Sequence, residues 1–312
     1  MVWIAVLAAS LSAIFCALMA AVNYSLLFSI FRSKVIKKSS SLTLFYSRFL
    51  IDGIIGTICV PLEIFMLMKL VFPQVNMSHY RTPVFAILST SVNLTNMRSL
   101  VVMIVSLQRV VAVCWPIFYR NARRKLSNFV LLTIVFLSPI GNSVLFFETC
   151  GNSLNFPLEC VVFACLTNQC YKSFLSIFGL VSKILTTSFT IVFALKLLVL
   201  RKSDSWKNMQ NTDRANQLAL VGAAIIVIFD VLPTTVYANI GSGQFEDYGA
   251  WLFCFKMGGF VLEGIIVRWT FMKKSKYTTG SSRKKTRNIS VLKVASDQND
   301  FKVETVPKPG IG

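Results

Sequence analysis

The chain has 312 residues, of which 54% are hydrophobic and only 14% are charged, and its mean hydropathy is +0.64. This composition excludes an ordinary soluble domain and predicts a protein that crosses the membrane several times. The formal net charge of +19 does not indicate nucleic-acid binding, because basic loops between apolar segments are what the positive-inside rule predicts. The lipid bilayer is an expected partner, and nucleic acid is not.

Seven apolar segments follow one another, each long enough to cross the roughly 30 Å hydrocarbon core of a bilayer. The predicted fold class is therefore an all-α membrane protein, a seven-transmembrane helix bundle within residues 1–271. Residues 272–312 are polar and basic, with too little apolar content for a core, and we expect a disordered tail there. We expect spanning helices at about residues 2–31, 42–68, 83–113, 126–147, 173–200, 218–240 and 250–271.

Basic residues are concentrated in alternate loops. The loops at 32–38, 120–125 and 201–214, together with the tail, are rich in lysine and arginine, whereas the opposite loops are nearly without them. The positive-inside rule then predicts an amino terminus outside the cell and a cytoplasmic carboxyl terminus. In this orientation the sequon at Asn76 is available for glycosylation.

Four cysteines lie in the predicted outer loop between the fourth and fifth segments, where disulfides persist. Four cysteines allow three pairings, and the sequence does not choose among them. We expect one or two bridges within this loop, with free thiols as the alternative. The four residues are Cys150, Cys160, Cys165 and Cys170.

Polar and charged side chains inside the apolar segments are informative, because each is costly in lipid unless it faces the bundle interior and has a partner. Arg98 lies eleven residues before Arg109, about 16 Å deeper on nearly the same helix face. We predict that Arg98 pairs with Asp52 and shares Glu263, in a polar network that includes Asn23. Two roles fit this pair: it holds the helices together, or it switches between two states.

The thirteen residues 107–119 (LQRVVAVCWPIFY) end the third segment. Their pattern of Arg109, Ala112, Val113, Pro116 and Tyr119 resembles the cytoplasmic end of the third helix in rhodopsin-type seven-helix receptors. Two positions depart from that pattern. Glutamine at 108 replaces the usual acid, and valine at 110 replaces the usual aromatic residue.

The same stretch, with the very short amino terminus and the short third inner loop, resembles the nematode serpentine chemoreceptors, and most closely their class BC group. The resemblance implies a G-protein-coupled receptor for an environmental small molecule, in the plasma membrane of sensory neurons and their cilia. Its implied partners are a heterotrimeric G protein and a small-molecule ligand, and no cofactor is expected. Receptors of the rhodopsin type usually tie the outer cysteine loop to the third helix, but no cysteine lies between Pro83 and Val113, so that tether is expected to be absent.

The resemblance also suggests a switch. Arg109 would be released for the G protein when the sixth helix swings outward near Pro233, with Pro116 and Tyr119 beside it. Asp213, twenty residues before Pro233, is the candidate acid that restrains Arg109 in the resting state; a helix cap is its alternative role. Because Arg98 supplies a fixed cation where related receptors hold sodium, we expect no sodium sensitivity.

The ligand pocket implied by the resemblance lies in the outer half of the bundle, where Lys183, Asp230 and Lys256 are the polar candidates. Lys256 lies near the position of the retinal lysine of opsins, but an internal ion pair with Glu263 or Asp230 is the preferred interpretation. The competing function is a transporter that uses the charged residues for a solute or proton path. No enzyme is indicated, because the cysteines lack metal-site spacing and the chain has no nucleophile elbow or phosphate loop.

Overall fold

The computed structural model describes residues 2–32, 43–72, 74, 80–125, 128–152, 167–201, 221–222, 224–240 and 251–270. The chain divides into two units, Met1–Trp269 and Thr270–Gly312. The predicted tail and parts of the basic loops lie outside the described residues. Within the described residues all regular structure is helical.

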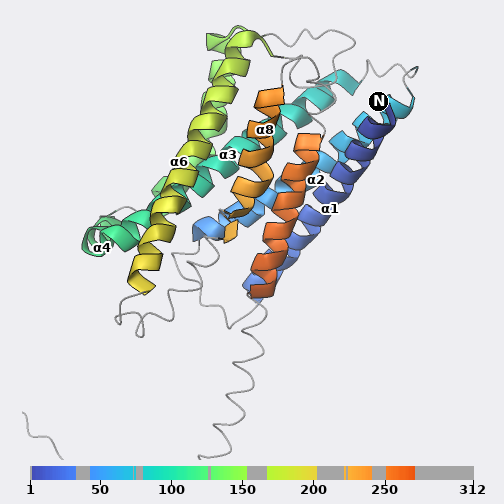
Figure 1. Ribbon diagram of the computed structural model, residues 1–312. Coiled ribbons are helices and arrows are strands. Elements are labelled where there is room, and N and C mark those ends of the chain that lie inside the picture. Colours follow the sequence, from blue (N-terminus) through green and yellow to red (C-terminus); the bar gives the residue numbers. More distant parts are fainter. Residues whose placement is uncertain are drawn as a thin grey trace, which may run out of the picture. The chain divides into compact units, whose positions relative to one another are not determined.

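Five described helices are long and apolar enough to cross a membrane, and they match the predicted segments to within a few residues (Figure 1). The fourth of these continues into a π-helical turn, η3 (Leu145–Thr149), and a short helix, α4 (Pro116–Lys125), follows the third. The five are α1 (Val2–Arg32), α2 (Thr43–Val71), α3 (Arg81–Cys114), α5 (Asn128–Val144) and α6 (Gln169–Arg201).

Of the two remaining spans, the sixth has a shorter apolar helix among its described residues and the seventh carries more charge. The sixth span comprises residues 221–222 and 224–240, and includes the π-helical turn η6 (Val227–Val231) and α8 (Leu232–Ile240). The seventh span is the helix at 251–270. It contains Lys256, Glu263 and Arg268, which accounts for its weaker apolar character.

Helix α3 ends where the sequence predicts a membrane exit. Pro116 disfavours the helical conformation of the residue before it, and Trp115 has φ −132° and ψ 68°. The Trp115 amide still donates to the carbonyl of Val111 at 2.9 Å, which closes the last turn. Pro116 then begins α4, a position that suits proline because the first amides of a helix have no partner inside it.

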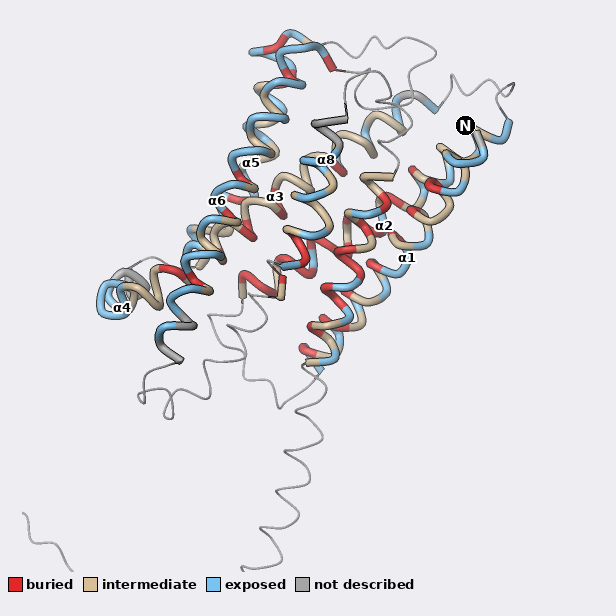
Figure 2. The backbone as a smooth tube through the Cα atoms, in the orientation of Figure 1, coloured by how far each residue is buried: buried red, intermediate tan, exposed pale blue. Residues whose placement is uncertain are grey.

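Helices α1 and α2 pack closely along their length. A Cβ atom at Gly56 would lie 2.6 Å from the carbonyl oxygen of Cys16 and 2.8 Å from the amide nitrogen of Ala20, so only glycine permits this approach. Helix α3 in turn packs against α2, α5 and α6. Buried residues gather on the facing sides of the helices (Figure 2).

Large apolar side chains on the opposite helix faces are exposed. Examples are Trp3 on α1 at 85%, Phe129 on α5 at 75% and Val199 on α6 at 66%. Such extensive exposed apolar surface is expected where lipid, rather than water, surrounds the helices.

The end of the bundle that carries the amino terminus also carries a disulfide between Cys150 and Cys170 (Figure 1). This bridge joins the end of η3 to the start of α6 and lies within the predicted outer loop, where one or two bridges were expected. Phe146 packs edge-on against Tyr171, with ring centroids 4.9 Å apart. Phe85 of α3 lies against Phe146 at 5.9 Å, so ring packing stands where other receptors have a covalent tether.

Candidate functional site

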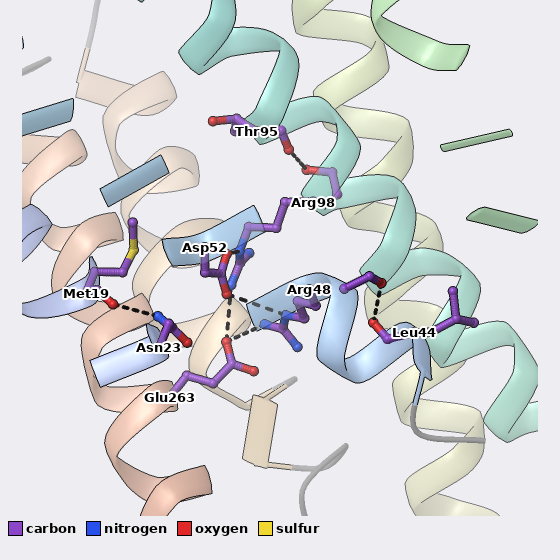
Figure 3. Close-up of polar contacts among 10 residues, drawn as sticks. Met19, Asn23, Leu44, Arg48, Asp52, Thr95, Arg98 and Glu263 are labelled. Atoms are coloured by element: carbon purple, nitrogen blue, oxygen red, sulfur yellow. Dashed lines mark hydrogen bonds and ion pairs between the residues drawn. The ribbon is translucent and has the colours of Figure 1, made fainter. Parts of the chain in front are cut away.

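Four buried charged side chains form a network among three helices (Figure 3). The Arg98 Nε of α3 lies 2.5 Å from Asp52 Oδ1 of α2, and its Nη2 lies 3.1 Å from Glu263 Oε2 of the seventh span. Arg48 of α2 donates to the same Glu263 oxygen, and its Nε lies 4.0 Å from Asp52 Oδ2. We call these four residues the ion network; the contacts predicted for Arg98 are part of it.

The sequence builds the network from local spacing. Arg48 and Asp52 are four residues apart, which places them on one face of α2 one turn from each other. Phe260 and Glu263 are three residues apart on the seventh span, so ring and carboxylate share a face. The Arg98 guanidinium stacks on that ring, with Cζ 3.5 Å from the centroid.

The sixth span closes the network on its remaining side. A Cβ atom at Gly222 would lie 2.6 Å from Glu263 Oε1 and 3.5 Å from Arg48 Nη1. The Glu263 carboxylate therefore rests directly on the backbone of Gly222. Any other residue at 222 would force the carboxylate or the sixth span to move.

The charges of the network balance. Two guanidinium groups face two carboxylates, and each of the four side chains is at most 7% exposed. A buried ion pair brings modest net stability, but removal of one partner leaves an uncompensated charge and costs about 3–5 kcal/mol. Removing any one of the four side chains would therefore leave a buried charge without its partner.

Asn23 lies beside this network and was expected to belong to it. Its side chain is 1% exposed, but its amide donates to the Met19 carbonyl one turn back in α1, at 2.9 Å. A polar residue on an apolar helix satisfies its donor locally when the carbonyl four residues before is within reach. The nearby charges are already paired with each other.

Arg48 is the member that sequence reasoning missed. The sequence places it near the predicted inner end of α2, where it was given no partner, and the structure buries it to 5% exposure. The available signal was its spacing of four residues from Asp52. The predicted network also assigned two acids, Asp52 and Glu263, to the single cation Arg98, which left one negative charge without a counter-charge.

The residues of the predicted coupling region are partly described. The Arg109 guanidinium lies over the ring of Phe45 on α2, with Cζ 5.4 Å from the centroid. Pro116 and Tyr119 lie on α4, just past the end of α3. Asp213, the candidate restraint, lies outside the described residues, as do Asn76, Cys160 and Cys165.

A second charged site lies among α6, the sixth span and the seventh span. Lys183 Nζ of α6 lies 2.9 Å from Asp230 Oδ1 and 3.3 Å from the hydroxyl oxygen of Thr234. Asp230 belongs to η6, in which hydrogen bonds span five residues. Because Pro233 has no amide hydrogen to donate to the carbonyl four residues before it, the wider turn before it is a natural accommodation.

Lys256 was predicted to pair with Glu263 or Asp230, and this pairing stays a prediction. Among the described residues it forms no ion pair within 4.0 Å, and its ammonium lies 5.9 Å from the Phe260 centroid. Glu263 is held by two guanidinium groups and Asp230 by Lys183.

The helices and their buried charges define a class, that of a polytopic α-helical membrane protein whose spans are joined by internal ion pairs. Residues 1–275 match the family described as Serpentine type 7TM GPCR chemoreceptor Srbc. The chain belongs to this family of seven-transmembrane G-protein-coupled chemoreceptors, as the resemblance implied. The family consists of receptors rather than enzymes, and no curated protein matches the chain.

Proposed function

We propose that the chain is a chemosensory receptor of the plasma membrane that binds an environmental small molecule in the outer half of the bundle. Binding would activate a heterotrimeric G protein through the third and sixth helices. The supporting observation is that the sixth span touches both charged sites: Gly222 lies against Glu263, and Asp230 lies against Lys183. A displacement of this span would change the surroundings of both sites together.

The proposed motion is an outward swing of the sixth span. The turn η6 and Pro233 interrupt its regular hydrogen bonding, and such points are where helices bend. A ligand that favours the swung state by a few kcal/mol would shift most of the population toward it. Gly222 would then leave Glu263, and the cleft beside Arg109 would open to the partner.

The proposed orientation puts the disulfide end outside the cell and α4 in the cytoplasm. Basic residues at 120 and 123–125 in α4 favour the cytoplasmic side. The disulfide at the other end favours an oxidising compartment. Sensory cilia are the proposed location, in keeping with a receptor for external chemicals.

The restraint on the switch is proposed from the sequence. Asp213 would hold Arg109 in the resting state, because glutamine replaces the acid that usually precedes this arginine. Its alternative role is to cap the start of the sixth helix. Only the first role ties Asp213 to signalling in the absence of ligand.

The test is guanine-nucleotide exchange on co-expressed Gα subunits, measured in membranes without added ligand. Wild type is compared with Asp213→Ala and Arg109→Ala at equal surface level. Lys196→Met serves as the matched control, because Lys196 is an exposed residue of α6 outside both charged sites.

Coupling predicts that basal exchange rises in Asp213→Ala and is lost in Arg109→Ala, while the control matches wild type. A rise would select restraint over capping as the role of Asp213. If Arg109→Ala and wild type gave the same exchange as membranes without receptor, the proposed coupling through helix three would be rejected. Solute uptake would then be the next assay, because the charged spans also fit a transport path.

A further inference from the structure

The second charged site, formed by Lys183, Asp230 and Lys256, differs from a simple structural ion pair. Its members come from three different spans, and all lie within the membrane-crossing part of the chain. Lys183 is fourteen residues past the start of α6, which is about 21 Å along the helix. The site therefore lies well below the membrane surface.

The Lys183–Asp230 pair is partly open. The Lys183 side chain is 26% exposed and that of Asp230 is 18% exposed, compared with 4–7% for the ion network. Charged groups inside a membrane face the bundle interior or a water-filled space rather than lipid. The pair is thus accessible to a molecule that enters the bundle.

The charges of this site do not balance. Among the described residues, two ammonium groups lie around one carboxylate: Asp230 contacts Lys183, and Phe229 next to it lies against Gly259, which is one helical turn from Lys256. Arg98 already has two acidic partners. Within the described part of the chain, Lys256 forms no ion pair within 4.0 Å, and a charge without such a partner is costly at low dielectric.

We infer that this site binds the carboxylate of a small organic acid, held between the ammonium groups of Lys256 and Lys183. The inference deepens the proposed function by naming the ligand class, and it rests on that function for its biological meaning. The bound anion would supply the missing negative charge.

Asp230 has a specific part in this proposal. It occupies Lys183 and competes with the incoming carboxylate for the same ammonium group. Replacing it with the isosteric asparagine frees Lys183 and removes a repulsive charge from the site. Asp230→Asn is therefore expected to strengthen binding of an organic acid, an effect that the loss of a structural residue would not produce.

The experiment measures thermal stability of the purified full-length receptor in detergent, by its intrinsic tryptophan fluorescence. The probes are butyrate, hexanoate and octanoate, each paired with the primary amide of the same chain length. The amides keep the shape and apolar part but lack the charge. Binding to the folded state raises the apparent Tm in a saturable manner, and the dependence on concentration gives an apparent Kd.

The expected result is that at least one acid raises the apparent Tm and its amide does not. Lys256→Met should weaken binding of that acid at least about tenfold, Asp230→Asn should tighten it, and the exposed-lysine control Lys196→Met should leave it unchanged. Equal shifts from acid and amide, or no shift from any acid, would overturn the inference. Weaker binding in Asp230→Asn would do so as well.

This assay contains no G protein, so its outcome is separate from the coupling test. If an acid binds but no nucleotide exchange is seen, the inferred carboxylate site is supported and the proposed coupling is rejected. Exchange that depends on Arg109, together with a failure of every acid, would keep the receptor function and reject the ligand class. If Lys256→Met does not fold, Lys183→Met and Asp230→Asn supply the same comparison.

Discussion

The ion network and the Lys183 site are both built from charged residues inside apolar spans. They differ in how deeply they are buried and in whether their positive and negative charges are equal in number. The ion network joins two arginines to two carboxylates and is almost fully buried. The Lys183 site places two lysines around one aspartate and is partly open. Arginine offers a planar fork of donors that suits shared carboxylates, whereas lysine is a compact charge on a flexible stem.

This difference separates a site that is complete from one that can accept a partner. In the ion network each charge is satisfied by protein, so a ligand would gain little there. In the Lys183 site a charge of the ligand would be met by a charge of the protein. The sixth span contacts both, which makes it the element through which one site can affect the other.

The largest expected effect comes from breaking the closed network. Arg98→Met leaves Asp52 buried without its closest partner and should lower the free energy of unfolding by about 3–5 kcal/mol. The measurement is the apparent Tm of purified receptor, with surface expression as the cellular readout. The double variant Arg98→Met with Asp52→Asn keeps the network neutral and should recover most of the loss. No recovery would mean that the pair is not the source of the effect.

A smaller effect is expected at the wall of the network. Gly222→Ala places a methyl group 2.6 Å from Glu263 Oε1, and overpacking of this kind costs about 1–3 kcal/mol. The variant should lower the apparent Tm and, under the proposed function, raise basal nucleotide exchange by favouring displacement of the sixth span. The matched control is Gly141→Ala on α5, where a Cβ would meet nothing within 4 Å. If the two variants had the same apparent Tm and basal exchange, the close contact between Gly222 and Glu263 would be contradicted.

The open pair should matter less for stability than either feature of the network. Part-exposed ion pairs contribute about 1 kcal/mol or less, so Lys183→Met and Asp230→Asn should each leave the apparent Tm within a few degrees of wild type. The thermal scan that tests this needs no ligand. A loss as large as that of Arg98→Met would show that the second site is structural and would erase the contrast between the two.

The smallest expected effect is none at all. Asp52 is already neutralised by Arg98, whose Nε lies 2.5 Å from its carboxylate, so the position offers no vacancy for a sodium ion. Replacement of sodium chloride by potassium chloride at the same ionic strength should leave the apparent Tm unchanged. A stabilisation specific to sodium would indicate that the Arg98–Asp52 contact opens in solution.

The spans and the Arg98 contact could be predicted from sequence because they follow from local rules. Apolar length gives a span, and the helical repeat places Arg98 at a definite depth. Arg48 could not be assigned correctly, because the choice of partner among several acids depends on how three helices pack. Asp52 and Glu263 were each within reach of more than one cation, and only the packing decided between them.

The glycine at 222 illustrates the same limit. In the sequence it stands in an apolar run with nothing to mark it. Its meaning comes from a carboxylate forty-one residues further along the chain. Likewise, Pro233 marked the region about which the sixth helix would swing, but not the π-helical turn that carries Asp230 toward Lys183.

The Cys150–Cys170 disulfide links η3 to α6 covalently but does not link either of them to α3. Phe85 at the disulfide end of α3 contacts Phe146 through their rings, an interaction worth about 0.5–1.5 kcal/mol and able to shift without breaking a covalent bond. Helix α3 therefore keeps a freedom to slide and turn about its own axis. Since the same helix carries Arg98 at mid-depth and Arg109 near its far end, a small axial movement at Phe85 would be transmitted along a rigid rod to both arginines.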